Sequence, residues 1–385
     1  MKEPQRETIK TSRIYSIDIL RGVVMLIMLL DHVRERFFYH VTVTDPINIE
    51  EVSTALFFTR ELAHLCAPIF VFLTGLSAWL YAYPKGKPSR SASSFLFKRG
   101  LFILLVEVTL INFSWYGEYK ILFLQVMWAI GISMICLSFM CKLPHKWIGV
   151  IGLIIVFGHN TLIDFILTPN DWGFTLWTIL YQRGYIYSSD LLSIKASYPV
   201  LPWIGVILTG YFTGPLFSDK FTKERRKNIL MLIGCCCLSL LIILRGFNIY
   251  GEALPWEQKD TFISSFMSFI NFKKYPPSLD FLLLTIGIGM FLLAFFETVQ
   301  NRCTTFLKTY GSAPMFFYIF HLYLLLFLYK GSVYLFGTTQ VEYFGFDHLW
   351  QIWLCTIILS IVLYFPTKAF SNYKIKSKSR WLKYL

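Results

Sequence analysis

Ten stretches of this sequence are apolar over the length that a helix needs to cross a lipid bilayer. Roughly 17 to 25 mostly apolar residues span about 30 Å of hydrocarbon. Apolar residues make up 55% of the 385-residue chain, which excludes an ordinary soluble domain. We therefore predict an all-α polytopic membrane protein with about ten transmembrane helices in one bundle. The stretches lie at residues 14–36, 62–82, 97–117, 121–141, 147–167, 199–218, 228–248, 280–299, 311–330 and 350–370.

The basic residues give this bundle an orientation. Cytoplasmic loops of membrane proteins collect Lys and Arg, whereas translocated loops do not. With both termini in the cytoplasm, most of the 36 basic residues fall on the cytoplasmic side, and most acidic loop residues fall on the other. We expect a cytoplasmic tail at 1–13, one transmembrane domain at 14–370 and a basic cytoplasmic tail at 371–385. The oligomeric state stays open, and a homodimer is one state that the sequence allows.

The net charge of +13 agrees with this topology. Basic residues at helix ends face anionic lipid headgroups, so we predict a bilayer partner and no nucleic acid. The sequence lacks the motifs of nucleotide hydrolysis, dinucleotide binding, zinc proteolysis and elbow-type esterases. The seven histidines are scattered, and the eight cysteines form no CxxC pair. We therefore predict no metal site.

Ionisable residues inside the first apolar stretch point to a function. A charge at membrane depth costs on the order of 2.5 to 3.5 kcal/mol on insertion scales, and it commonly marks a functional site. Arg21 and His32 are 11 residues apart, which returns to nearly the same helix face after about 16 Å. Asp18 could pair with Arg21, and Asp31 supplies a carboxylate beside His32. In the structural alternative, Asp18 and Arg21 lock the helix and His32 bonds a neighbouring helix.

Further polar residues lie in other apolar stretches. His64, at the outer end of the second stretch, is either a second acid/base group or an interfacial histidine. His159 and Asn160 lie toward the outer end of the fifth stretch, where we expect them to join His32 in an outer cavity. His321, near mid-membrane, we interpret as a packing residue. Two outer loops, near 168–198 and 249–279, are rich in aromatic residues, which form either an interfacial belt or a platform for a sugar ring.

Several strings along the chain resemble one family. In order they are SIDILRGVVMLIMLLDHVRERFF, ALFFTRELAHLCAPIFVFLTG, LQVMWAIG, FGHN, PVLPWIGV, KYPPSLDFLLLTIG and FFYIFHLYL. Together they resemble bacterial membrane proteins that are similar to heparan-alpha-glucosaminide N-acetyltransferase. The LRG string followed by His32 also resembles the opening of the wider acyltransferase-three group, whose conserved Arg and His map onto Arg21 and His32.

The resemblance implies an enzyme of the bacterial inner membrane. It implies transfer of an acyl group, normally acetyl, from cytoplasmic acyl-CoA to a sugar or glycan acceptor on the extracytoplasmic side. On this basis His32, with His64, would deprotonate the acceptor amine or hydroxyl. Arg21 and Arg99 would hold the CoA phosphates, and Asp18 would orient Arg21.

Two points stay open at the sequence level. Asn160 or Asn112 would donate a hydrogen bond to the developing oxyanion. The chain also departs from the lysosomal enzyme, whose loop after the first helix carries the histidine assigned to catalysis; here His40 lies elsewhere in that loop. The alternatives are a transporter of a small anionic or sugar-linked molecule and a non-catalytic scaffold, although we find no clear inverted repeat.

Overall fold

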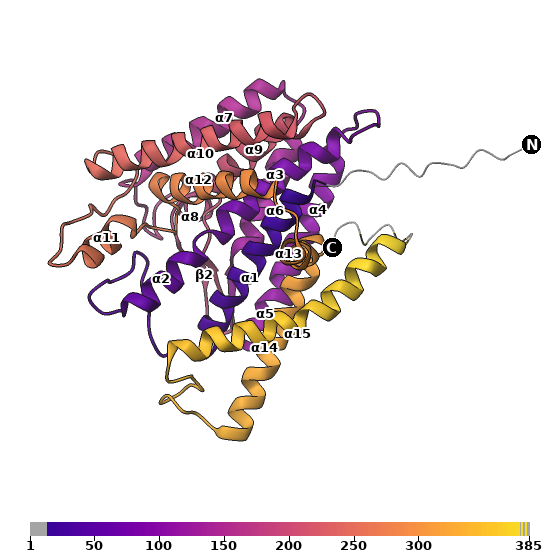
Figure 1. Cartoon of the computed structure of the whole chain (residues 1–385). Helices are drawn as coiled ribbons and strands as arrows, with labels where there is room; N and C mark the ends of the chain where they lie inside the picture. Colours follow the sequence, from indigo (N-terminus) through magenta and orange to yellow (C-terminus); the bar gives the residue numbers. More distant parts are fainter. Residues whose placement is uncertain (1–13, 378, 380–381, 383–385) are drawn as a thin grey trace, which may run out of the picture.

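The computed structural model describes residues 14–377, 379 and 382, and it is mostly helical (Figure 1). The predicted amino-terminal tail at 1–13 lies outside the described residues. The α-helices are α1 (Tyr15–Phe37), α2 (Thr54–Ala63), α3 (Cys66–Ala82), α4 (Ser93–Val106), α5 (Asn112–Tyr116), α6 (Val126–Met140), α7 (His145–Gly158), α8 (Phe174–Leu180), α9 (Leu201–Thr213), α10 (Lys223–Gly246), α11 (Phe262–Ile270), α12 (Leu279–Phe296), α13 (Arg302–Ser312), α14 (Pro314–Phe336) and α15 (Leu349–Lys376). A π-helical turn, η1 (Glu107–Ile111), joins α4 to α5, and 3₁₀ turns follow α7 and α9 at η2 (His159–Leu162) and η3 (Gly214–Phe217).

The prediction of a helical bundle is confirmed in its main feature. Within the described residues, five helical segments have the length and hydropathy to cross a membrane. They are Thr54–Ala82, Lys223–Gly246, Leu279–Phe296, Pro314–Phe336 and Leu349–Lys376. The number of ten spans and the side on which each terminus lies stay predictions. The predicted last span ends inside α15, because that helix continues to Lys376 and so takes in the start of the predicted tail at 371–385.

Helix α1 lies inside the bundle, where it contacts α2, α3, α12, α13, α14 and α15. Figure 1 shows it running between these helices. Its contact with α13 is unusually close: a Cβ atom on Gly22 would lie 1.9 Å from the Leu307 carbonyl oxygen, and one on Gly311 would lie 1.8 Å from the Asp18 carbonyl oxygen. Small residues allow such backbone-to-backbone packing in membranes. The pair of glycines therefore fixes the height of Asp18 and its neighbour Arg21 in the bundle.

Other close helix contacts extend the bundle away from α1: α3 packs with α9, α9 with α7, α4 with α6, and α10 with α12. Hydroxyl side chains cap the starts of several of them, as when Ser278 Oγ accepts from the Phe281 N–H at 3.1 Å to begin α12. Helix α10 is mostly exposed although it is strongly apolar. Such an exposed apolar surface is what a lipid-facing helix requires.

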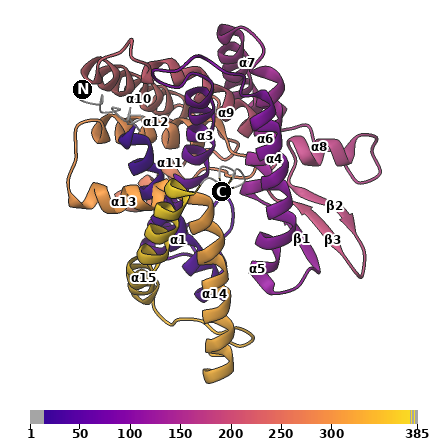
Figure 2. The ribbon, with the colours of Figure 1, turned by 90° about the vertical axis from the view of Figure 1, so that its right-hand side faces the viewer.

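A small sheet corrects the all-α prediction. Strands β1 (Ile121–Leu124), β2 (Gly184–Ser188) and β3 (Ser193–Ala196) pair in the order β1-β3-β2, with β1 parallel and β2 antiparallel to β3. Figure 2 shows the sheet with α8 at one edge of the molecule, outside α4 and α6. The predicted span at 121–141 is thus wrong at its start, since residues 121–124 are a strand and the helix begins at Val126.

Buried side chains explain why this apolar segment is not helical. The Asn112 amide donates to the Phe123 carbonyl at 3.1 Å and accepts from the Phe123 N–H at 2.6 Å. A Glu107 carboxyl oxygen accepts from the Gln125 N–H at 2.8 Å. These bonds satisfy the backbone of β1 without a helical turn. The Asn112 amide also donates to the Glu107 carbonyl at 2.8 Å and does not line the cavity described below, which corrects its predicted role as an oxyanion donor.

Candidate active site

One large cavity, of about 1510 Å³, follows α1 and α3 into the molecule. At one end it is lined by exposed basic residues, which we call the basic mouth: Lys85, Lys87, Arg90, Lys220 and Lys223. At the other end it is lined by buried side chains, which we call the inner end: Asp31, His32, Tyr198, Lys274 and Tyr318. Because the lining at the mouth is exposed, the cavity opens there to solvent.

Asp18, Arg21 and Arg99 line the cavity between these two ends. The Arg21 guanidinium donates to Asp18 Oδ1 at 3.1 Å and to the Ser77 hydroxyl on α3. Arg99 comes from α4, and its buried Nε atom has no hydrogen-bond partner among the described residues. The structure therefore places these three residues in the lining of one cavity, with Asp18 bonded to Arg21; their binding of CoA stays a prediction.

His32 lies at the inner end and is joined to a second histidine. Its Nδ1 atom lies 2.8 Å from His321 Nε2, and the two ring planes are nearly parallel, 7° apart, with centroids 5.1 Å apart. His321 Nδ1 lies 2.7 Å from the Phe317 carbonyl oxygen, which can only accept, so Nδ1 carries the proton. In a neutral His321, Nε2 then accepts from the Nδ1–H of His32. This leaves His32 Nε2 with the lone pair that a general base needs.

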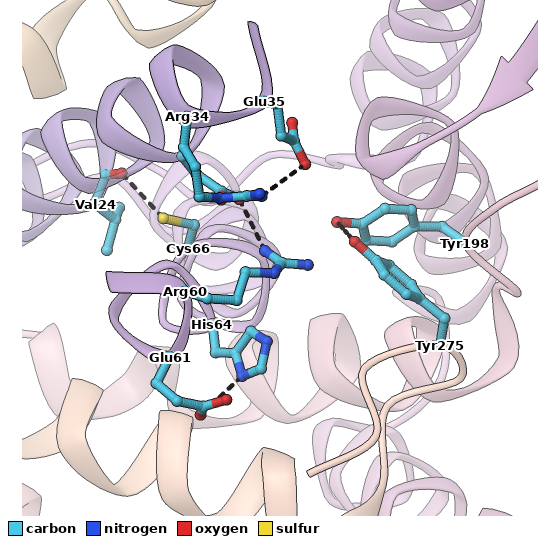
Figure 3. A network of polar contacts seen from close by, with 10 residues as sticks. Val24, Arg34, Glu35, Arg60, Glu61, His64, Cys66, Tyr198 and Tyr275 are labelled. Atoms are coloured by element: carbon cyan, nitrogen blue, oxygen red, sulfur yellow. Dashed lines mark hydrogen bonds and ion pairs between the residues drawn. The ribbon is translucent and has the colours of Figure 1, made fainter. Parts of the chain in front are cut away.

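Asp31 has a different partner from the one expected. Its Oδ1 accepts from Arg34 Nη2 at 2.9 Å, and its Oδ2 accepts from Arg60 Nη1 at 3.0 Å. Figure 3 shows the two guanidinium groups facing each other between α1 and α2, with Glu35 beside Arg34. Both carboxylate oxygens are thus held by arginines. Asp31 lines the cavity, but in this arrangement its carboxylate holds two arginines, and the partner of His32 is His321 instead.

Three predicted residues lie outside the cavity lining: His64, His159 and Asn160. His64 Nδ1 lies 3.0 Å from Glu61 Oε2 within the α2–α3 segment (Figure 3). His159 Nε2 lies 2.8 Å from the Pro277 carbonyl oxygen, and Asn160 Oδ1 accepts from the Leu279 N–H at 2.9 Å. His159 and Asn160 therefore fasten the end of α7 to the start of α12. The expectation that they share an outer cavity with His32 is not met.

Two tyrosines separate the inner end from an exposed loop. The Tyr275 hydroxyl donates to the Tyr198 hydroxyl at 3.2 Å, and Figure 3 shows the pair facing Arg60. Burial, followed by the neighbouring Tyr275, raises the pKa of Tyr198 well above its ordinary value, so this hydroxyl stays protonated. The exposed Arg183 guanidinium lies 4.7 Å from the Tyr275 ring centroid. The wall between cavity and solvent is thus only a few side chains thick here.

Sequence reasoning missed Lys274, Tyr318 and the role of His321. The available signal for His321 was its position within an apolar helix, where an ionisable side chain is costly. Nothing in the sequence pairs it with His32, because 289 residues separate the two.

A family comparison agrees with this geometry. The family described as heparan-alpha-glucosaminide N-acetyltransferase, catalytic, matches residues 13–245, which is more than half of the chain. The chain belongs to this family. The resemblance predicted from the sequence is therefore confirmed, and with the apolar helices it makes the protein an integral membrane protein of an acetyltransferase family. The matched region includes Arg21, Arg99 and His32, whereas Lys274 and His321 lie beyond it. None of the curated proteins compared with the chain matches it.

Proposed function

We propose that this protein transfers an acetyl group from cytoplasmic acetyl-CoA to an amino or hydroxyl group of a sugar acceptor on the opposite side of the membrane. The observation that carries the proposal is the single cavity that joins the basic mouth to His32. Membership of the acetyltransferase family supports the reaction class. The donor, the acceptor and the two sides of the membrane are part of the proposal.

The cavity residues fit acetyl-CoA as the donor. CoA carries phosphates at one end and a thioester at the other, joined by a long, narrow arm. The basic mouth and the Arg21 and Arg99 guanidinium groups suit the phosphates, since guanidinium binds phosphate oxygens in pairs. At the mouth, the Trp79 and Tyr83 rings stack with centroids 4.9 Å apart and offer an aromatic surface to the adenine. The arm would then lie along α1 and α3, with the thioester near His32.

The chemistry follows from the free nitrogen of His32. Nε2 removes a proton from the acceptor amine or hydroxyl, which attacks the thioester carbonyl carbon. The C–S bond breaks, and the departing CoA thiolate receives the proton from the His32 imidazolium. His321 keeps Nδ1 of His32 bonded throughout, so the same nitrogen takes up and returns the proton. The net products are an acetylated acceptor and CoA.

The sides of the reaction follow from the charges. The positive-inside rule puts the basic mouth in the cytoplasm, with both termini there and about ten spans in a bacterial inner membrane. The tyrosine wall would then face the extracytoplasmic side. An acceptor sugar would reach His32 by way of the Tyr198 and Tyr275 hydroxyl groups.

Purified protein in detergent, mixed with acetyl-CoA and a panel of amino and neutral sugars, tests the proposal. We expect free CoA thiol to appear in step with an acetylated sugar detected by mass spectrometry. His32→Ala should lower kcat by about 10²- to 10⁴-fold, the usual contribution of a general base. Tyr323→Phe is the control, since the Tyr323 hydroxyl donates to the Leu110 carbonyl at 3.0 Å and does not line the cavity. Failure of the wild-type protein to bind acetyl-CoA in calorimetry would reject the proposal and favour the transporter.

A further inference from the structure

Lys274 places a buried positive charge at the inner end of the cavity. The residue is 4% exposed and lines the cavity near Asp31 and His32. Among the described residues, its ammonium group lies 5.3 Å from the Tyr275 ring centroid and has no ion pair or hydrogen bond. Asp31 is not free to neutralise it, because Arg34 and Arg60 hold both carboxylate oxygens. The ammonium therefore keeps its hydrogen-bonding capacity for something inside the cavity.

The surrounding loop holds Lys274 in this place. Asp45, from the loop after α1, accepts from the Lys274 backbone N–H at 3.0 Å and from the Tyr275 N–H at 3.1 Å. Lys274 and Pro277 also form an isolated antiparallel bridge. A carboxylate that accepts two backbone bonds fixes the loop tightly. Lys274 is thus positioned by a built structure, although it comes from a connection between α11 and α12.

Tyr318 adds a second unused donor at the same end. The residue is 1% exposed, lines the cavity, and its hydroxyl has no hydrogen-bond partner among the described residues. Its ring contacts that of His32 edge to face, with centroids 5.9 Å apart. Tyr318 lies three residues before His321 on α14, so the same helix supplies both the partner of the base and this hydroxyl.

The Tyr318 hydroxyl is a buried donor without a partner, which is unfavourable in the resting protein, and Lys274 adds a positive charge at the same end of the cavity. A buried hydroxyl without a partner costs roughly 1–3 kcal/mol, and a buried charge costs more. Enzymes accept this cost where negative charge develops only during the reaction. The tetrahedral intermediate of acyl transfer carries such a charge on the former carbonyl oxygen.

We propose that Lys274 and Tyr318 form the oxyanion site for acyl transfer. The inference rests on the proposed function and adds two catalytic residues to it. When the acceptor attacks, its new bond to the thioester carbon moves the carbonyl electron pair onto oxygen. The Lys274 ammonium and the Tyr318 hydroxyl then donate to this O⁻. As the C–S bond breaks, the pair returns to form the new carbonyl, and neither donor loses its proton. Asn160, an earlier candidate for this role, does not line the cavity.

The test compares Lys274→Met and Tyr318→Phe with two matched controls. Lys273→Met changes the neighbouring lysine, and Tyr323→Phe removes a hydroxyl from the same helix; neither residue lines the cavity. We expect kcat to fall by about 10²- to 10³-fold in Lys274→Met and about tenfold in Tyr318→Phe, in line with loss of an oxyanion donor. The KM for acetyl-CoA and its affinity in calorimetry should change less than twofold. Both controls should keep the wild-type kcat.

Three results would overturn the assignment. One is a wild-type kcat in both variants, and another is a rise in the KM for the acceptor with kcat unchanged, which would make Lys274 an acceptor-binding residue. The third is a Tyr318→Phe variant whose kcat falls only because the protein is less stable, so that the loss of kcat disappears when activity is expressed per folded protein. Tyr318→Phe removes a single oxygen atom, and it still tests the assignment if Lys274→Met does not fold. Absence of acetyl transfer by the wild-type protein would instead reject the proposed function.

Discussion

The two ends of the cavity both contain ion pairs of basic and acidic side chains, but the pairs differ in exposure to solvent. At the basic mouth, Lys85 pairs with Asp219, and their side chains are 61% and 59% exposed. At the inner end, the pairs of Asp31 with Arg34 and Arg60 are about one-tenth exposed. An exposed pair is worth about 0–1 kcal/mol, whereas removing one member of a buried pair costs about 3–5 kcal/mol. At the mouth, therefore, the total positive charge matters more than any one pair. At the inner end, each individual ion pair contributes to stability.

The largest effect should come from breaking the inner ion cluster. Asp31→Asn keeps the shape of the side chain but leaves the buried Arg60 guanidinium without a carboxylate and Arg34 with Glu35 alone, at 3.4 Å. We expect a loss of about 3–5 kcal/mol in the free energy of unfolding. Thermal unfolding in detergent, followed by tryptophan fluorescence, measures it. Asp219→Asn at the mouth is the matched control and should change stability by less than about 1 kcal/mol; equal losses in both variants would remove the contrast between the two ends.

The next effect concerns the partner of the base. His321→Ala removes the acceptor that fixes the tautomer of His32, so we expect kcat to fall by about 10- to 100-fold with little change in the KM for acetyl-CoA. His321→Gln offers an amide oxygen to His32 Nδ1 and should recover part of the loss. Equal activity of the Ala and Gln variants would show that His321 only fills space.

A smaller effect should follow from changes at the mouth. In Lys220→Met combined with Lys223→Met, two exposed cations are lost from the rim, and we expect the KM for acetyl-CoA to rise by about three- to tenfold at low salt. The difference from wild type should shrink at 0.5 M salt, where the Debye length falls to about 4 Å. The kcat should stay the same; a lower kcat would mean that the rim reaches the reacting end.

The smallest effect is expected for His64. His64→Ala removes a buried ring that is paired with Glu61 but does not line the cavity. We expect kcat within about threefold of wild type and a loss of about 1–3 kcal/mol in stability. A kcat as low as that of His32→Ala would restore the sequence-based role of His64 and contradict the cavity assignment.

The sequence predicted the features that depend on one helix. Apolar length alone marked most of the helices, and the spacing on α1 correctly put Arg21 and His32 along one cavity. It could not show which residues meet across helices, as His32 meets His321. It also predicted a helix where β1 lies, because a short apolar run such as 121–124 is compatible with a strand or a helix. The hydrogen bonds with the Asn112 side chain, which favour the strand, are not visible in the sequence. The sequence misplaced His159 and Asn160 for a similar reason: it shows that they follow an apolar stretch but not that they face the start of α12.

The close contact of Gly22 with α13 bears on the choice of donor. Because the backbones of α1 and α13 touch, α1 has no room to slide or turn against its neighbour. Arg21 and His32 lie on this one helix, so their backbones stay about 16 Å apart along its axis. In the proposed function, this separation sets the distance between the phosphate-binding arginine and the general base. The protein would in this way select its acyl donor by length. A thioester on a shortened carrier could bind its phosphates at Arg21 or place its carbonyl at His32, whereas full-length acyl-CoA could do both.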